Sequence, residues 1–313
     1  MPAAGDDGAL GLAVTAAVRL GLGPDRVVAR DSSGGGFLNP HRDEGSDNDV
    51  DRRMAPAILA AFASDSGIVA AVGGLRRNVG DADAAAAEAH RLPVILLSRW
   101  SRAGGGMNAF CLCVSQPRLA AFARATARER FGPRLLLVLV GDAAMLPATW
   151  PGRLGEAPVA RVETPAGADA ARRRARDADA VLVVADERPP TLWRGSAFRR
   201  LFDRAFLTRL GHRDFLAVPA GTPRGEVLVL REVLPDGAAR RAFVRRFHAQ
   251  AGFLPGDDAV RGYAAAQILR AAGPGREAVR RALRGRRFDT VAGAVAFDAD
   301  GYRANAVLAA APP

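Results

Sequence analysis

Short apolar runs alternate with helical stretches along most of this chain, and this alternation limits the fold more than any other feature. The runs are bounded by glycine, aspartate or proline, as buried strands usually are. We predict strands at residues 26–30, 68–72, 94–97, 110–114, 135–140, 159–162, 180–184, 215–218 and 227–230. Repeated β-α-β units favour parallel sheets with right-handed crossovers and helices on both faces. Because so many units exceed one small sheet, the sequence predicts two α/β lobes.

The segments between the strands have the spacing of amphipathic helices. We predict these helices at residues 10–20, 50–63, 81–91, 117–130, 168–177 and 196–210, with three more close together at 237–251, 257–271 and 276–283. The acidic run at 43–51 is predicted as a solvated loop whose last carboxylates cap the next helix. A hairpin is predicted at the end, with strands at 291–297 and 305–310 around a tight turn at 298–301.

The basic charge of the chain is unusual in kind. The formal net charge is +11, and all 44 basic residues are arginine, a bias typical of GC-rich coding sequences. The arginine clusters fall on the polar sides of separate predicted helices, at 172–176, 240–246 and 276–287. Aromatic residues do not interleave with them as in a stacking platform for nucleic acid. We interpret the clusters as solvated helix faces and expect no nucleic-acid partner, although the charge still favours an acidic ligand or partner.

The sequence lacks the motifs that would indicate an enzyme. It has no P-loop, no G-x-S-x-G elbow and no H-E-x-x-H pair, and its four histidines are scattered. Cys111 and Cys113 share one face of a predicted strand, where we expect buried small side chains rather than a disulfide or metal ligands. No window is apolar enough to span a membrane, and the start has no secretory signal pattern. We therefore expect no catalysis, no metal and no cofactor.

Polar residues follow the carboxyl ends of the predicted strands, where open parallel sheets bind their ligands. A glycine-rich loop at 73–78 leads into a helix N-terminus, which favours an anionic group. Hydroxyl, indole and charged side chains follow the other strands. The candidate ligand contacts are Asn78, Ser98, Trp100, Ser101, Asp142, Glu187 and Arg224. The two serines would donate hydrogen bonds to the ligand, the tryptophan would pack on it, and Asp142 would accept.

Several phrases resemble a known family. They are Ile-Val-Ala-Ala-Val-Gly-Gly at 68–74, His-Arg-Leu-Pro-Val-Ile at 90–95, Gly-Tyr-Ala-Ala-Ala-Gln-Ile-Leu at 262–269, and Phe-Asp-Thr-Val-Ala-Gly-Ala-Val-Ala-Phe-Asp-Ala-Asp-Gly at 288–301. With the order of elements, they resemble type 1 periplasmic solute-binding proteins, the leucine/isoleucine/valine-binding branch of ABC uptake systems. The resemblance implies two Rossmann-like lobes with mostly parallel sheets, joined by a three-crossing hinge that closes on the ligand. Lobe 1 would comprise residues 1–115 and 234–303, and lobe 2 residues 116–233 and 304–313.

The same resemblance implies a function. The chain would bind a small polar molecule in the cleft between the lobes, as the substrate-binding component of an ABC uptake system for amino acids or related compounds. Its macromolecular partner would be an ABC permease, and its location would be periplasmic or at the cell surface. Because the sequence has no signal peptide, a cytoplasmic location stays open. The alternative function is a ligand-sensing or regulatory domain of the same fold without a transport role.

Departures from the family pattern concern the ligand and the start of the chain. The hydroxyl residue of the family's first ligand loop falls on Asn78 or Val79, no tyrosine follows Asp142, and the acid that holds the ligand ammonium falls on Ala220. An unpaired ammonium in a closed cleft would cost several kcal/mol, so a standard α-amino acid is not the expected ligand. The family's opening strand is missing as well. We expect an upstream start, a fragment or a degenerate domain.

Overall fold

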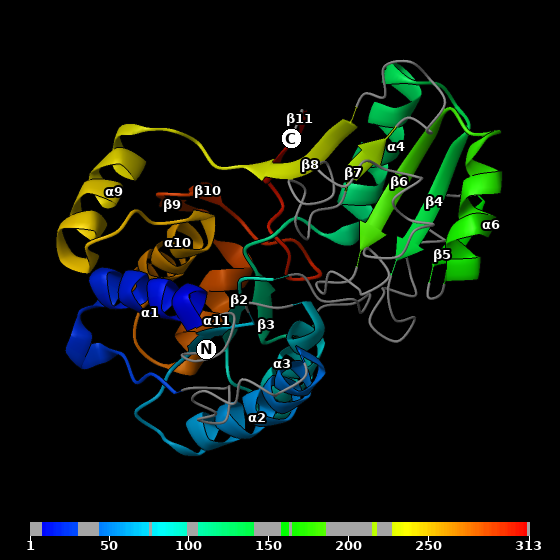
Figure 1. Ribbon diagram of the computed structural model, residues 1–313. Coiled ribbons are helices and arrows are strands. Elements are labelled where there is room, and N and C mark those ends of the chain that lie inside the picture. The colour runs from blue at the N-terminus through cyan, green and yellow to red at the C-terminus, as the bar shows by residue number, and fades with distance from the viewer. Residues whose placement is uncertain are drawn as a thin grey trace. The chain divides into compact units, whose positions relative to one another are not determined.

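The computed structural model describes residues 8–30, 44–74, 77–98, 106–140, 158–162, 165–185, 215–217 and 227–311 (Figure 1). The chain divides into two units. Unit 1 comprises Met1–Val114 and Leu234–Ala306, and unit 2 comprises Ser115–Val233 and Val307–Pro313. The chain therefore passes between the units three times, at residues 114–115, 233–234 and 306–307.

The sheet of unit 1 has three short parallel strands in the order β1 (Ala71–Gly73), β2 (Val94–Leu96) and β3 (Ala109–Cys111). Successive side chains of a strand point to opposite faces of a sheet. Ile95 and Phe110 accordingly lie in one buried apolar cluster, while Val94 and Ala109 lie in another. Both faces of the sheet are therefore covered, as a parallel sheet requires.

Helices supply the other side of each cluster. The first cluster includes residues of α1 (Gly8–Leu22), α9 (Ala238–Ala251), α10 (Asp257–Ala272) and α11 (Arg276–Gly285). The second includes residues of α2 (Glu44–Ser64) and α3 (Arg77–His90). Helices α1 and α10 lie side by side in Figure 1 and approach closely at small residues. A Cβ added to Gly21 would lie only 2.4 Å from the Cβ of Ala266, so this contact requires glycine.

Unit 2 contains a six-stranded sheet in the order β11-β8-β7-β6-β4-β5. Its strands are β4 (Leu135–Val140), β5 (Val159–Val162), β6 (Ala180–Ala185), β7 (Phe215–Ala217), β8 (Val227–Val233) and β11 (Val307–Ala311). The central strand β4 pairs in parallel with β5 and β6. Helix α4 (Gln116–Arg130) precedes β4, and helix α6 (Pro165–Ala175) connects β5 to β6. Unit 2 is thus a second α/β unit with a parallel centre, as the sequence predicted.

Two predictions for the first part of the chain are wrong. Residues 26–30 do not form a strand: a short 3-10 helix, η1 (Pro24–Arg26), is followed by residues without regular secondary structure, among which Val28 is exposed. Two valines between arginines give too short an apolar run to be buried. The acidic run also differs from the predicted loop, because helix α2 begins at Glu44. Carboxylates in the first turns of a helix are stabilised by its positive end, so the acids extend the helix.

The end of the chain also pairs differently from the prediction. The hairpin of unit 1 consists of β9 (Phe288–Thr290) and β10 (Gly293–Val295), and the Thr290 hydroxyl closes its turn by donating to the Gly293 carbonyl at 2.7 Å. The predicted turn at 298–301 is confirmed, since the Gly301 amide donates to the Asp298 carbonyl at 3.0 Å. The last strand, β11, does not return to this hairpin but pairs with β8 of unit 2. An apolar pattern indicates a strand without specifying its partner.

The described helices otherwise lie close to their predicted positions. The predicted helix at 196–210 falls outside the described residues. No helix in the described part of the chain is both long and apolar enough to cross a membrane. Among the same residues, no group of three or more histidine, cysteine, aspartate or glutamate side chains is placed to hold a metal ion.

Candidate ligand-binding site

The carboxyl ends of the three parallel strands of unit 1 lie at one edge of the sheet. Gly73 pairs with Leu96, and Leu96 pairs with Cys111, so the strands end side by side. The ladder continues for one more residue, because the Leu97 amide donates to the Gly73 carbonyl at 3.0 Å. Open parallel sheets bind ligands beyond this edge. We therefore take this edge of unit 1 as the start of the candidate site.

A tight turn carries the chain out of β1 at this edge. Gly74 has a φ of +63°, in the left-handed region that favours glycine. A Cβ at this position would also lie 2.8 Å from Cδ2 of Leu96 on the neighbouring strand. The glycine therefore lets the backbone turn close to β2 on its way to the N-terminus of α3.

A buried carboxylate faces this turn. Asp83 on α3 is only 3% exposed, and its Oδ2 lies 3.4 Å from the position that a Cβ of Gly74 would occupy. Our sequence analysis did not single out Asp83. A signal was present, because Ala86 and Ala87, three and four residues later, lie on the same helix face and are both buried. A charge on the buried side of a helix indicates either a structural network or a ligand site.

The two cysteines hold the backbone at the end of β2. The Cys111 thiol donates to the Ser98 carbonyl at 3.2 Å, and the Cys113 thiol donates to the Leu97 carbonyl at 3.1 Å. Both cysteines are free and buried, which confirms that they serve as small buried side chains on one face. Their thiols fix the direction in which the chain leaves β2, and so they position the half-buried Ser98 at the edge.

Two of the seven predicted contacts lie at this edge of unit 1. Asn78 is in the first turn of α3, directly after the turn at Gly74, and Ser98 follows β2 by two residues. The other five, Trp100, Ser101, Asp142, Glu187 and Arg224, lie outside the described residues.

The sheet of unit 2 has a corresponding edge. Strands β4 and β6 are adjacent and parallel, and their last residues, Val140 and Ala185, are paired. Asp142 and Glu187 each come two residues after one of these strand ends in the sequence. Strand β7 differs from the prediction, since it runs antiparallel to β6 and the chain leaves it at the opposite edge. A strand of three residues carries too little pattern to encode its direction. Topology therefore favours Asp142 and Glu187 over Arg224.

The architecture is the type 1 periplasmic binding fold: two α/β units joined by three passages of the chain. Solved structures with this fold cover nearly the whole chain. An ABC transporter substrate-binding protein from Sphaerobacter thermophilus superposes with a TM-score of 0.64 at 16% identity, covering 100% of this chain and 95% of the other. The leucine-binding protein LivK from Thermotoga maritima superposes with a TM-score of 0.64 at 15% identity, covering 100% of this chain and 97% of the other.

The description of a third solved structure names a different ligand. It is a solute-binding protein of an ABC transporter from R. palustris in complex with benzoate, with a TM-score of 0.57 at 18% identity, covering 100% of this chain and 94% of the other. All three structures are described as binding proteins. A scan of family models and a search of curated proteins returned no match. The resemblance stated from the sequence is thus confirmed by structures at the level of the fold.

Proposed function

We propose that this chain is a solute-binding protein that holds a small polar molecule at the carboxyl edges of its two sheets. The observation that carries the proposal is the edge of unit 1. There the left-handed turn at Gly74 and the half-buried Ser98 follow the ends of adjacent parallel strands. A ligand held between such edges would draw the units together, as hinge-closing binding proteins do.

The ligand we propose is an amino-acid-like or other small organic acid. The structures with the same fold are described as binding leucine in one case and benzoate in another, so this architecture accepts acids with and without an ammonium group. In this chain Ala220 stands where the family's acid for the ammonium is expected. An acid without an ammonium group avoids the cost of leaving that charge unpaired.

The proposed role is the substrate-binding component of an ABC uptake system, acting outside the cytoplasm with a permease. The proposal rests on the fold and on the resemblance of the sequence phrases. A sensing domain would use the same site, so a binding experiment tests the shared step of both functions.

Thermal shift and titration calorimetry of the full chain would test the binding step. Leucine, isoleucine and benzoate form the panel of ligands, and we expect benzoate to raise the melting temperature more than leucine. Replacing Ser98→Ala removes a hydrogen-bond donor to the carboxylate of the ligand, so this variant should bind the ligand about tenfold more weakly.

A serine on the surface of unit 1 provides the matched control. The Ser64 hydroxyl donates to the Ala60 carbonyl at the exposed end of α2, so Ser64→Ala should leave binding unchanged. The proposal fails if no member of the panel stabilises the protein. It also fails if Ser98→Ala binds as tightly as Ser64→Ala.

A further inference from the structure

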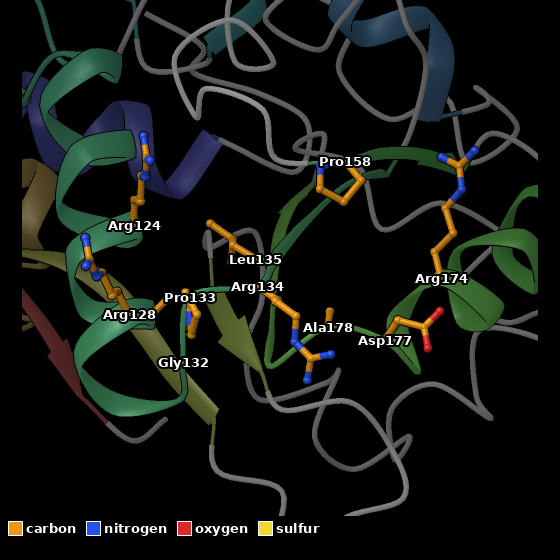
Figure 2. Close-up of a pocket in the computed structure, with 11 residues that line it drawn as sticks. Arg124, Arg128, Gly132, Pro133, Arg134, Leu135, Pro158, Arg174, Asp177 and Ala178 are labelled. Carbon is orange, nitrogen blue, oxygen red and sulfur yellow. The ribbon is translucent and has the colours of Figure 1, made fainter.

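Unit 2 contains a cavity of about 420 Å³ at the edge of its sheet opposite to the candidate solute site (Figure 2). The residues that line it precede the strands instead of following them: Pro133 and Arg134 come before β4, Pro158 before β5, and Ala178 before β6. Because β4, β5 and β6 are parallel, these residues meet at the amino-terminal edge. The cavity therefore cannot be part of a site at the carboxyl edge.

Four arginines surround this cavity. Figure 2 shows Arg124 and Arg128 on α4 at one side and Arg174 on α6 at the other, with Arg134 between them. All four side chains are exposed. The Arg134 guanidinium is paired with Asp179 at 2.6 Å, and Asp177 is the acid in the lining. The four guanidiniums and the two carboxylates together give the site a net charge of +2.

Structural roles account for only some of these arginines. Both helices end at this edge, and cations in the last turn of a helix offset its negative end. This explains Arg128 and Arg174, and Arg174 also donates to the Val159 carbonyl at 2.6 Å. Arg124 lies more than a turn before the end of α4, beyond the reach of that effect. Within the described residues, no hydrogen bond or ion pair engages the guanidinium of Arg124 or Arg128.

The floor of the cavity is apolar, unlike its rim. Ala127 and Leu135 are buried beneath it, and Pro133 and Pro158 add ring surfaces. Small-molecule sites commonly have this combination of an apolar body and a few polar groups, at volumes of about 300–1,000 Å³. Guanidinium groups bind phosphates and carboxylates through paired hydrogen bonds.

We propose that this cavity binds a small organic anion with at least two negative charges, of the phosphate-ester class, independently of the solute site. The anionic groups contact Arg124, Arg128 and Arg174, and the organic body lies on the apolar floor. In Figure 2 the guanidinium groups are spread around the cavity, so binding restricts long exposed side chains. That loss of rotamer freedom makes the affinity modest.

The probes for a binding test are adenosine triphosphate, inorganic pyrophosphate and citrate, titrated calorimetrically into the full chain. The variant Arg124→Gln/Arg128→Gln removes the two guanidiniums that no described residue engages. The control Arg130→Gln/Arg173→Gln removes the same charge from the same two helices, at exposed residues outside the lining. We expect saturable binding of adenosine triphosphate that is tighter than that of pyrophosphate, because only the former has a body for the apolar floor.

The first variant should weaken adenosine triphosphate binding by about tenfold or more, since each charge-assisted hydrogen bond contributes about a factor of ten. The control should change it less than about twofold, the size expected from long-range charge at physiological salt. Tighter binding of citrate than of both phosphates would overturn the assignment to phosphate esters. The absence of saturable binding by all three probes, or equal weakening in the two variants, would overturn the site itself.

Discussion

Replacing Arg303 by methionine should destabilise unit 1 strongly, because this arginine ties together two segments of the chain. Its side chain is buried, and its Nη2 donates to the Ala292 carbonyl at 2.7 Å and to the Ala294 carbonyl at 3.1 Å. Its backbone amide donates to the Cys111 carbonyl at 3.0 Å. Arg303 therefore links the hairpin of β9 and β10 to strand β3 of the same unit.

The size of the effect follows from the two hydrogen bonds that would be lost, of which the one to Ala294 counts less because Nδ2 of Asn305 also donates to that carbonyl at 2.8 Å. A hydrogen bond to a charged group contributes about 1.5–3 kcal/mol, so the two bonds together contribute about 3–6 kcal/mol. Methionine fills a similar volume and removes the cost of burying a guanidinium, which offsets part of this loss. We expect the free energy of unfolding to fall by about 3 kcal/mol. Whole proteins are stable by only about 5–15 kcal/mol, so the change is easily measured.

Urea unfolding followed by far-ultraviolet circular dichroism measures this change, and amide exchange of residues 288–297 locates it in the hairpin. The matched control is Arg286→Met. The Arg286 guanidinium also donates to a backbone carbonyl, that of Ala271 at 3.0 Å, but it does so at the surface. Water replaces an exposed donor, so this variant should lose less than about 1 kcal/mol. Equal losses in the two variants would refute the argument that burial decides the contribution.

Three further changes test other parts of the structure. Gly74→Ala should lower the free energy of unfolding by about 1–2 kcal/mol or more in urea, because it forces a side chain into the left-handed region. The hydrogen bond from Arg134 lowers the pKa of Asp179, so the pair stabilises the fold at pH values above the ordinary pKa of about 3.8. This stabilisation is lost as the pH falls through the pKa of Asp179 in the folded protein, and Asp179→Asn should remove that pH dependence from the melting temperature. Cys111 and Cys113 should react with a thiol reagent only at the rate of unfolding, and fast labelling in native buffer would contradict their burial.

Strand positions could be predicted from the sequence where a mostly apolar run lies between clear boundaries. Strands β4 and β5 occupy the residues predicted for them, because each is a run of mostly aliphatic residues between polar or proline boundaries. The direction of β7 and the partner of β11 could not be predicted in this way. Pairing depends on contacts between segments far apart in the chain, and a local apolar pattern contains no information about them.

The candidate site could be located from the sequence only where its place follows from the order of the strands. The rule for carboxyl ends of parallel strands places Asn78 and Ser98 at one edge because the order of β1 and β2 follows from the β-α-β repeat. The same rule does not point to Asp83, because it concerns loops after strands and this carboxylate lies on the buried face of a helix. All seven predicted ligand contacts stay predictions, and five of them lie outside the described residues.

The arginine bias has a physical consequence that the net charge conceals. We interpreted the clusters as solvated helix faces, but several guanidiniums instead donate to backbone carbonyls. Arg276 donates to the carbonyls of Ile68 and Asp65 at 2.9 and 2.7 Å, and Arg284 donates to that of Gly106 at 2.7 Å. A guanidinium has five donors in a fixed plane and can serve separate chain segments at once, which a lysine ammonium does less well. These guanidiniums keep their charge but use their donors inside the fold. Direct contacts with an anion are therefore expected where, among the described residues, a guanidinium lies beside a cavity without such carbonyl contacts, as Arg124 does.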